Sequence, residues 1–291
     1  MFGVRILRRC VELGLLACVG ATDVAHGSES FESRFHVFRA DVVKALARGE
    51  GNRRSEVREA FDRQFATVHL PSLSSDDAGY FLRALADVTF HQPDADLTAV
   101  AMQVVLRHGL TELQPFSGPR LVDQMLLGDR SFGGAAAWRV RFSGFDDAPL
   151  PQVERLNAGH HRMYIISEDG RHLLELDSHI ATGDGLLIVG HPACGFSRSA
   201  AEWMRDQIGN AGPRVLWLAP VDGNLQLTML LQWNRQFPSQ AFAIARSSDD
   251  WQFIDTWDTP QFFWLAGGQI REWSAGWNES SRALVRRFNA E

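Results

Sequence analysis

The sequence predicts a mixed α/β protein, in which a helical N-terminal region precedes a C-terminal unit with the element order β-α-β-α-β-β-β-α. Three observations predict this class. Apolar residues recur with helical spacing over residues 30–130. From about residue 184 onward, short apolar runs alternate with amphipathic segments. Eight of the nine tryptophans lie between residues 203 and 277, which indicates that the C-terminal unit has a core of its own.

Composition excludes several classes of protein. At roughly 100–200 residues per domain, 291 residues correspond to one large domain or two ordinary ones. Hydrophobic residues at 45% and charged residues at 22% are typical of a globular chain and exclude a disordered or fibrous one. The net charge of −6 argues against a nucleic-acid partner, because such binding needs a basic face.

The first 27 residues have the outline of a secretory signal peptide. Three arginines precede an apolar run over residues 13–21, and polar residues follow. The string Leu15-Leu16-Ala17-Cys18 resembles a lipobox, which would place a lipid anchor on Cys18. We expect a bacterial protein exported to the periplasm, either free or membrane-anchored. In the alternative, residues 1–27 form an ordinary amphipathic helix and the protein stays in the cytoplasm.

The pattern changes at three positions and divides the chain into four segments. They are a candidate signal peptide at 1–27, a helical domain at 28–130, a short β-rich connector at 131–183 and the α/β unit at 184–291. Four helices are expected in the helical domain, namely Phe31–Arg48, Ser55–Val68, a helix that begins near Ser74, and Asp94–His108, which Gly109 ends.

The connector is expected to be extended. Trp138–Phe142 alternates with period two, as a strand does. Met163–Ile166 and His172–Leu176 flank the string Ser167-Glu168-Asp169-Gly170, which predicts a β-hairpin with Asp-Gly in its turn.

The α/β unit shows its elements in a clear order. We expect strands at Leu186–Gly190, Arg214–Leu218, Ala241–Ala245, Gln261–Leu265 and Gln269–Trp273, and helices at Ser197–Ile208, Leu225–Phe237 and Ser280–Phe288. Helices connect the first strands, so that part of the sheet is expected to be parallel. The last two strands are expected to form an antiparallel hairpin across Gly267-Gly268.

Cys194 has the strongest chemical signal. It lies between an expected strand and an expected helix, in the string His191-Pro192-Ala193-Cys194-Gly195-Phe196-Ser197. Free backbone N–H groups and the helix dipole stabilise a thiolate at such a position, and the thiolate is the nucleophile of thiol–disulfide exchange. Ser197, one turn later, is placed to donate a hydrogen bond to the sulfur. The alternative is an inert buried thiol, with a serine that only favours the helix start.

These features together resemble the thioredoxin-like fold. The string PACGFS around Cys194 is similar to the CGFS active-site signature of monothiol glutaredoxins, and Trp257–Gln261 is similar to their Trp-x-Thr-x-Pro-Gln stretch. The remainder of the unit is closer to thioredoxin-like proteins, in which a cis-proline precedes the last hairpin. The resemblance implies that Cys194 is the nucleophile, that Ser197 replaces a resolving cysteine, and that Pro260 is cis beside the sulfur.

The sequence departs from glutaredoxins where they bind glutathione. Their lysine before the cysteine is absent from Leu187–Gly190, and their later Gly-Gly and acidic pair is not found near Ser274–Glu279. We expect no cofactor. Glutathione is the one alternative, and the missing lysine and the missing Gly-Gly and acidic pair both argue against it. A glutathione-ligated iron–sulfur cluster is disfavoured for the same reason.

Residues around the motif have weaker signals. A protonated His191 would stabilise a thiolate, although a solvated loop histidine is the commoner explanation. The residues expected to bind substrate are Trp257, Thr259, Pro260 and His191. Five of the ten histidines lie within residues 160–191, but no pair shows a zinc spacing and Cys194 has no partner cysteine. We therefore expect no metal site.

Two hypotheses for function follow. In the first, the protein is a monothiol thioredoxin-like oxidoreductase or isomerase, in which Cys194 attacks mixed disulfides or the disulfides of client proteins. In the second, the thioredoxin-like fold is a non-catalytic module that binds a protein partner, since a fold does not imply a function. A peroxiredoxin-like peroxidase is a weaker third, because the Gly-Phe-Ser string after the cysteine does not fit it.

Overall fold

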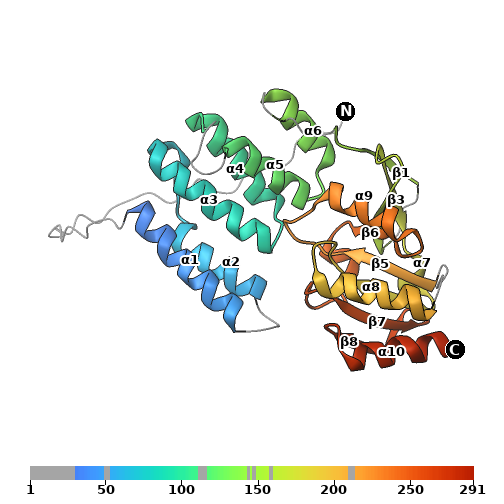
Figure 1. Cartoon of the computed structure of the whole chain (residues 1–291). Helices are drawn as coiled ribbons and strands as arrows, with labels where there is room; N and C mark the ends of the chain where they lie inside the picture. The colour runs from blue at the N-terminus through green and yellow to red at the C-terminus, as the bar shows by residue number, and fades with distance from the viewer. Residues whose placement is uncertain are drawn as a thin grey trace.

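The structure is a computed structural model that describes residues 30–48, 53–110, 117–142, 145, 149–156, 160–208 and 214–291. The candidate signal peptide and Cys18 lie outside the described residues. Figure 1 shows helices α1–α6 followed by a mixed sheet with further helices on it, and this arrangement confirms the predicted α/β class. No helix in the described part of the chain is long and apolar enough to cross a membrane.

The helical region begins with the four helices that the sequence predicts. Its helices are α1 (Phe31–Ala47), α2 (Arg53–Phe65), α3 (Ser75–His91), α4 (Ala95–His108), α5 (Gly118–Gly128) and α6 (Phe132–Arg141). Ser74 and Asp94 cap α3 and α4, because their side chains accept hydrogen bonds from backbone N–H groups of the first turn. Gly109 ends α4 with φ 59°, a left-handed conformation that glycine adopts without a steric penalty.

The prediction of a strand at Trp138–Phe142 is wrong, because these residues lie in α6 and at its end. Ala135 and Trp138 are three residues apart and both are buried, whereas Val140 is 89% exposed. The Trp138 indole N–H donates to the carbonyl oxygen of Pro119 in α5 at 2.8 Å. Apolar and polar residues alternate over these five positions although the segment is helical. A window of five residues is too short to distinguish one buried face of a helix from a strand.

The described strands form one eight-stranded sheet in the order β1-β3-β2-β6-β5-β4-β7-β8. They are β1 (Gln152–Arg155), β2 (Arg162–Ile166), β3 (His172–Asp177), β4 (Gly185–Val189), β5 (Val215–Ala219), β6 (Phe242–Ala245), β7 (Gln261–Ala266) and β8 (Gln269–Ala275). The predicted hairpin is confirmed as β2 and β3, and β2 also pairs with β6. As predicted, β4, β5 and β6 are parallel, and β7 and β8 form an antiparallel hairpin.

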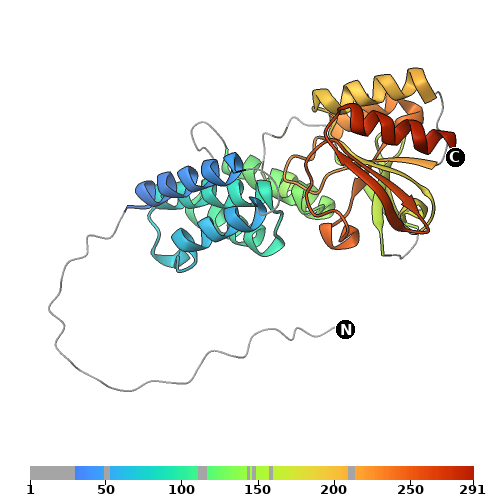
Figure 2. The same ribbon diagram turned by 90° about the horizontal axis from the view of Figure 1, so that it is seen from below.

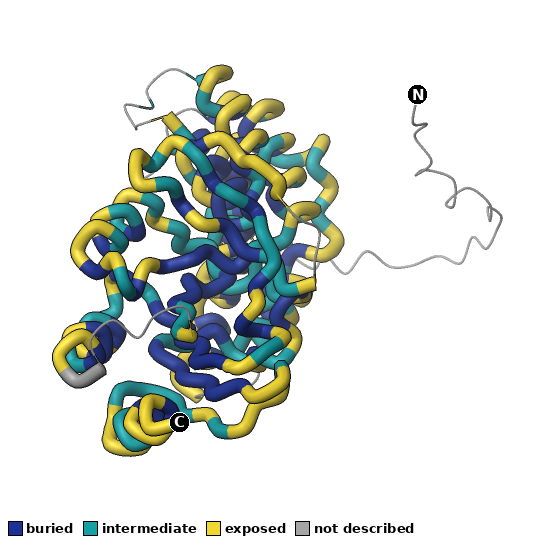
Figure 3. The backbone as a smooth tube through the Cα atoms, turned by 90° about the vertical axis from the view of Figure 1, so that its right-hand side faces the viewer, coloured by how far each residue is buried: buried dark blue, intermediate teal, exposed yellow. Residues whose placement is uncertain are grey.

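Helices cover one face of the sheet, while a short helix and irregular chain cover the other. α8 (Gly195–Ile208), α9 (Leu227–Gln236) and α10 (Glu279–Ala290) share a hydrophobic cluster with Leu186 and Ile188 of β4. Leu187 and Val189 belong to a second cluster with α7 (His179–Thr182) and residues 251–257. This alternation is that of a strand buried on both faces. Figure 2 shows α8 and α10 over the same face, and Figure 3 shows buried chain in the interior with exposed residues mostly on the outside.

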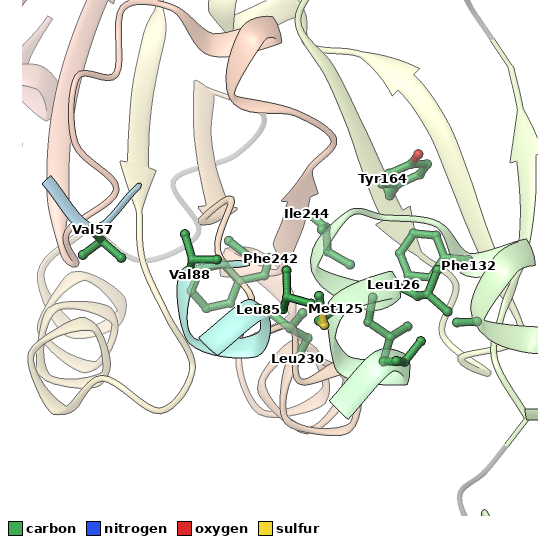
Figure 4. Packing of buried hydrophobic residues seen from close by; sticks show 14 of the residues in the cluster. Val57, Leu85, Val88, Met125, Leu126, Phe132, Tyr164, Leu230, Phe242 and Ile244 are labelled. Carbon is green, nitrogen blue, oxygen red and sulfur yellow. The ribbon is translucent and has the colours of Figure 1, made fainter. Parts of the chain in front are cut away.

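The helical region shares its hydrophobic core with the sheet. Figure 4 shows Leu85 and Val88 of α3 and Met125 of α5 beside Phe242 of β6 and Leu230 of α9. All five side chains belong to one cluster, which continues from α1 to α10. The helices therefore pack directly on the α/β unit.

Hydrogen bonds between the two parts concentrate at the carboxyl ends of β5 and β6. The buried Arg130, between α5 and α6, donates to the carbonyl oxygens of Pro220 at 2.7 Å and Ala245 at 3.1 Å. The Gly223 N–H donates to the Phe90 carbonyl oxygen at 2.9 Å, and a Cβ on Gly223 would lie only 2.6 Å from the Phe90 Cα. Since ligand sites of α/β sheets form at the carboxyl ends of parallel strands, the helical region is docked where a site is expected.

Candidate active site

Cys194 lies in the turn between β4 and α8, as predicted. Its N–H donates to the carbonyl oxygen of His191 at 2.9 Å, and its carbonyl oxygen accepts from the Arg198 N–H at 3.1 Å. The side chain is half-buried and is a free thiol, and no other cysteine occurs among the described residues. The sulfur thus lies at the start of a 14-residue helix, where free N–H groups and the helix dipole favour negative charge.

Ser197 couples the thiol to the backbone of the loop. It is fully buried, and its Oγ accepts a hydrogen bond from the His191 N–H at 3.3 Å. The hydroxyl hydrogen is then left to donate to the Cys194 sulfur. Burial raises the pKa of the Cys194 thiol, but hydrogen bonds from the Ser197 backbone and hydroxyl, together with Thr259 and the Phe196 backbone, outweigh burial and bring the pKa below its ordinary value.

The segment before β7 forms the other side of the site. The Thr259–Pro260 peptide bond is cis, as the resemblance implies, and the neutral Cys194 thiol donates to the Thr259 carbonyl oxygen at 3.5 Å. The buried Gln261 amide holds this segment, because it donates to Thr256 Oγ1 at 2.7 Å and to the Asp258 carbonyl oxygen at 3.1 Å. The fold therefore brings Cys194, Thr259 and Pro260 together.

His191 connects the cysteine loop to the loop after β5. Its Nδ1 accepts a hydrogen bond from the Ala193 N–H at 3.1 Å, which requires that this nitrogen carries no proton. Its Nε2 lies 3.4 Å from both the carbonyl oxygen and the side-chain Nδ2 of Asn224. In this arrangement the His191 ring joins the cysteine loop to the loop that contains Asn224.

Two residues of the site come from α2, and the sequence did not single them out. Arg53 pairs with Asp258 through Nη1 and Oδ1 at 3.0 Å. The Arg54 guanidinium lies 6.0 Å from the ring centre of Trp257, which is only 8% exposed. Since 205 residues separate Arg53 from Asp258, no local pattern could have indicated this contact.

His161 and His172, two of the five histidines of residues 160–191, have separate partners. His161 Nδ1 lies 2.6 Å from the Asp250 carbonyl oxygen, and His172 Nδ1 lies 2.7 Å from Glu154 Oε1. Within the described ranges, no group of three or more His, Cys, Asp or Glu side chains is arranged to hold a metal ion.

Comparison with known proteins gives a distant likeness in structure. A crystal structure of a thioredoxin-like protein from Bacteroides caccae matches with 10% sequence identity and a TM-score of 0.31, over 95% of this chain and 99% of that chain. At these values the likeness carries no weight for the site. No protein-family model matches the chain, and no curated protein matches it.

Proposed function

We propose that the protein is a monothiol, thioredoxin-like thiol–disulfide exchange protein with Cys194 as its nucleophile. One observation carries the proposal: the half-buried sulfur at the start of α8 lies within hydrogen-bond reach of Ser197 and faces the Thr259 carbonyl oxygen, beside a cis proline. The hydrogen bonds that lower the pKa of Cys194 increase the fraction of thiolate at neutral pH. The thiolate is the species that attacks disulfides.

The reaction consists of two exchange steps. The Cys194 thiolate attacks one sulfur of a substrate disulfide, so that a bond to Cys194 forms while the substrate S–S bond breaks. The leaving sulfur takes the electron pair as a thiolate and is protonated by solvent. A second thiol then attacks the mixed disulfide in the same manner and releases the Cys194 thiolate. Each step breaks one disulfide bond and forms another, and it consumes one thiol and releases one. The cycle therefore needs no further oxidant.

Mixed disulfides are the substrates that fit best. Ser197 stands one turn after Cys194, where a resolving cysteine would otherwise lie, and no second cysteine occurs in the described part of the chain. An intramolecular dithiol cycle is therefore not built into this site. Reduction of mixed disulfides, or isomerisation of client disulfides, requires only the single thiol.

Turnover of a mixed disulfide tests the proposal. The substrate is a peptide whose cysteine carries a small-thiol adduct, with excess 2-mercaptoethanol as the second thiol, and release of the peptide thiol is followed by mass spectrometry. In a chain whose Cys10 and Cys18 are replaced by serine, the rate above that of 2-mercaptoethanol alone is expected to rise in proportion to added protein. This added rate is expected to be absent with Cys194→Ser. Ser199→Ala, an exposed serine on the same helix, serves as control and keeps the rate. Equal rates for wild type and Cys194→Ser would contradict the proposal.

The exposed ring of Phe196 favours a second function. This side chain is 63% exposed and lies two residues after Cys194. An exposed aromatic residue at the site is suited to anchor a protein partner without turnover. In that case the wild type shows no turnover in the assay above, and Cys194→Ser binds the partner as the wild type does.

A further inference from the structure

A cleft lies between the helical region and the loop that precedes the cis proline. It has a volume of about 630 Å³ and is bordered by the first residues of α2, the end of α3 and Asp255–Asp258. Small-molecule sites have volumes of roughly 300–1,000 Å³. Trp257, in the wall of the cleft, is two residues from Thr259, and two residues of chain span at most about 7 Å. The cleft is therefore next to the segment that faces the Cys194 sulfur.

Arg54 is a cation in the wall of this cleft. Its guanidinium donates to the Val221 carbonyl oxygen at 2.6 Å, and it has no ion pair with any carboxylate of the described residues. Burial lowers the pKa of Arg54, whereas the charges of Asp222 and Asp258 raise it. A guanidinium has five N–H donors, so Arg54 retains donors for a ligand. A partly buried cation with unused donors favours an anion.

The other arginines of the cleft already have carboxylate partners. Arg53 pairs with Asp258 at 3.0 Å. Arg58 pairs with Asp94 at 2.6 Å and with Asp62 at 3.1 Å. All three arginines carry the same charge, but only Arg54 donates to a backbone carbonyl oxygen without an ion pair to a carboxylate of the described residues.

The acidic residues of the cleft include Asp222 and Asp258, whose charges act on Arg54, although neither forms an ion pair with it. Asp222 accepts a hydrogen bond from the Asn224 N–H at 2.9 Å, and Asp255 and Glu59 are exposed. At the end of α3, burial lowers the pKa of His91, Asp87 raises it, and three arginines including Arg54 lower it further.

We propose that Arg54 selects disulfide substrates that carry a carboxylate. The carboxylate binds in the cleft while a sulfur of the same molecule meets Cys194. A planar guanidinium can donate two parallel hydrogen bonds to a carboxylate, so the contact fixes orientation as well as charge. This inference rests on the proposed exchange reaction and assigns a specificity residue for it to the helical region.

Two disulfides of equal length test the inference. Dithiodipropionate carries two carboxylates, and its diamide is uncharged. The protein is the full chain with Cys10→Ser and Cys18→Ser, so that Cys194 is its one thiol, and the mixed disulfide is followed by intact mass. The rate ratio of dicarboxylate to diamide is expected to be about tenfold higher in the folded chain than in the chain unfolded in urea.

Arg54→Gln is expected to bring this ratio down to that of the unfolded chain, and Arg54→Lys is expected to keep part of the preference. Arg205→Gln removes the same charge from an exposed position on α8 and is expected to keep the full ratio. An unchanged ratio in Arg54→Gln would overturn the inference, even if both rates fall together.

Salt gives a test that needs no substitution. Because the contact joins two charges, the preference of the folded wild-type site is expected to decrease as ionic strength rises, while the diamide rate does not change. A preference that is independent of salt would contradict the role of Arg54. Failure of the exchange reaction itself looks different, since Cys194 would then react with both disulfides no faster than in the unfolded chain.

Discussion

Ser197 forms hydrogen bonds with two groups of the proposed site. Its Oγ accepts the His191 N–H at 3.3 Å, and its hydrogen is left for the Cys194 sulfur. The residue is fully buried, so no water can replace it without a rearrangement of the loop. We therefore assign to Ser197 the role of a positioning residue that adjusts the proton affinity of the nucleophile.

Ser197→Ala is expected to raise the pKa of Cys194, because it removes a hydrogen bond that favours the thiolate. With less thiolate at neutral pH, alkylation of Cys194 by iodoacetamide should slow by about tenfold, as for the loss of one hydrogen bond to a charged group. The rate is measured by mass spectrometry of the tryptic peptide 172–198. Ser199→Ala is the control. Equal rates in the Ser197 variant and the wild type would show that the hydroxyl does not act on the thiol.

The residues of the site differ in how far the sequence predicts them. Cys194, Ser197 and Pro260 lie in short strings that are recognisable by themselves, and the structure brings them together. Arg53 and Arg54 have no such string around them. They reach the site only because α2 packs against a loop about two hundred positions later in the chain.

At the scale of elements, the corner between α5 and α6 is unusual because it places a partly buried Asp129 beside a buried Arg130. Burial raises the pKa of Asp129 to about 6 and lowers the pKa of Arg130 to about 10. Arg130 adopts φ 58° and donates only to backbone carbonyl oxygens, those of Pro220 and Ala245 among them. Both residues are therefore charged at neutral pH, and the corner holds α5 and α6 against the ends of β5 and β6.

Asp129→Asn is expected to stabilise the protein at neutral pH. The folded-state pKa of Asp129 lies above its unfolded value, so folding favours the neutral form. That contribution to stability is fully present below about pH 4 and is lost as the pH rises through about 6. Asparagine stays neutral throughout. The difference in free energy of unfolding between the variant and the wild type should therefore increase, in favour of the variant, by about 1–2 kcal/mol from about pH 4 to pH 7. This value includes a discount for the partial exposure of Asp129.

Urea unfolding at both pH values measures this gain. Asp206→Asn, at an exposed position of α8, is the control for the loss of one negative charge. A difference between Asp129→Asn and the wild type that is the same at both pH values would contradict the role of Asp129.

Elements with a local start or stop signal could be predicted from the sequence. Ser74 and Asp94 begin α3 and α4, and Gly109 ends α4. The helix α6 lacks such a signal, because Ser131 makes no side-chain cap hydrogen bond and Gly133 and Gly134 occupy its first turn. Glycine lowers helix propensity, so the pattern there favoured a strand.

At the scale of the whole molecule, the helices and the sheet depend on one hydrophobic core. The same cluster includes Phe38 of α1, Leu85 of α3, Phe242 of β6 and Phe288 of α10. The sheet also joins distant parts of the chain, since β2 pairs with β6 over some eighty positions. The sequence predicts both strands but not their pairing, because long-range partners leave no local pattern.

A shared core predicts that the described regions unfold in one transition. Tryptophan fluorescence reports mainly on the α/β unit, which holds eight of the nine tryptophans, whereas far-ultraviolet circular dichroism also reports on α1–α6. Denaturation curves from the two signals are expected to coincide. Arg130→Met should lower the free energy of unfolding by about 3 kcal/mol in both curves, because five carbonyl oxygens lose a hydrogen bond from the guanidinium. Separate transitions would show that the helical region folds alone.

The pKa of the Cys194 thiol decides whether this residue is poised as a nucleophile. Iodoacetamide alkylation of the full chain is followed across pH through the tryptic peptide 172–198, once in the folded protein and once in denaturant. The midpoint in the folded protein is expected to lie below that of the unfolded chain, which should be at about 8.5. A midpoint at or above the unfolded value, or a thiol that reacts only in denaturant, would contradict the role of Cys194 as a nucleophile.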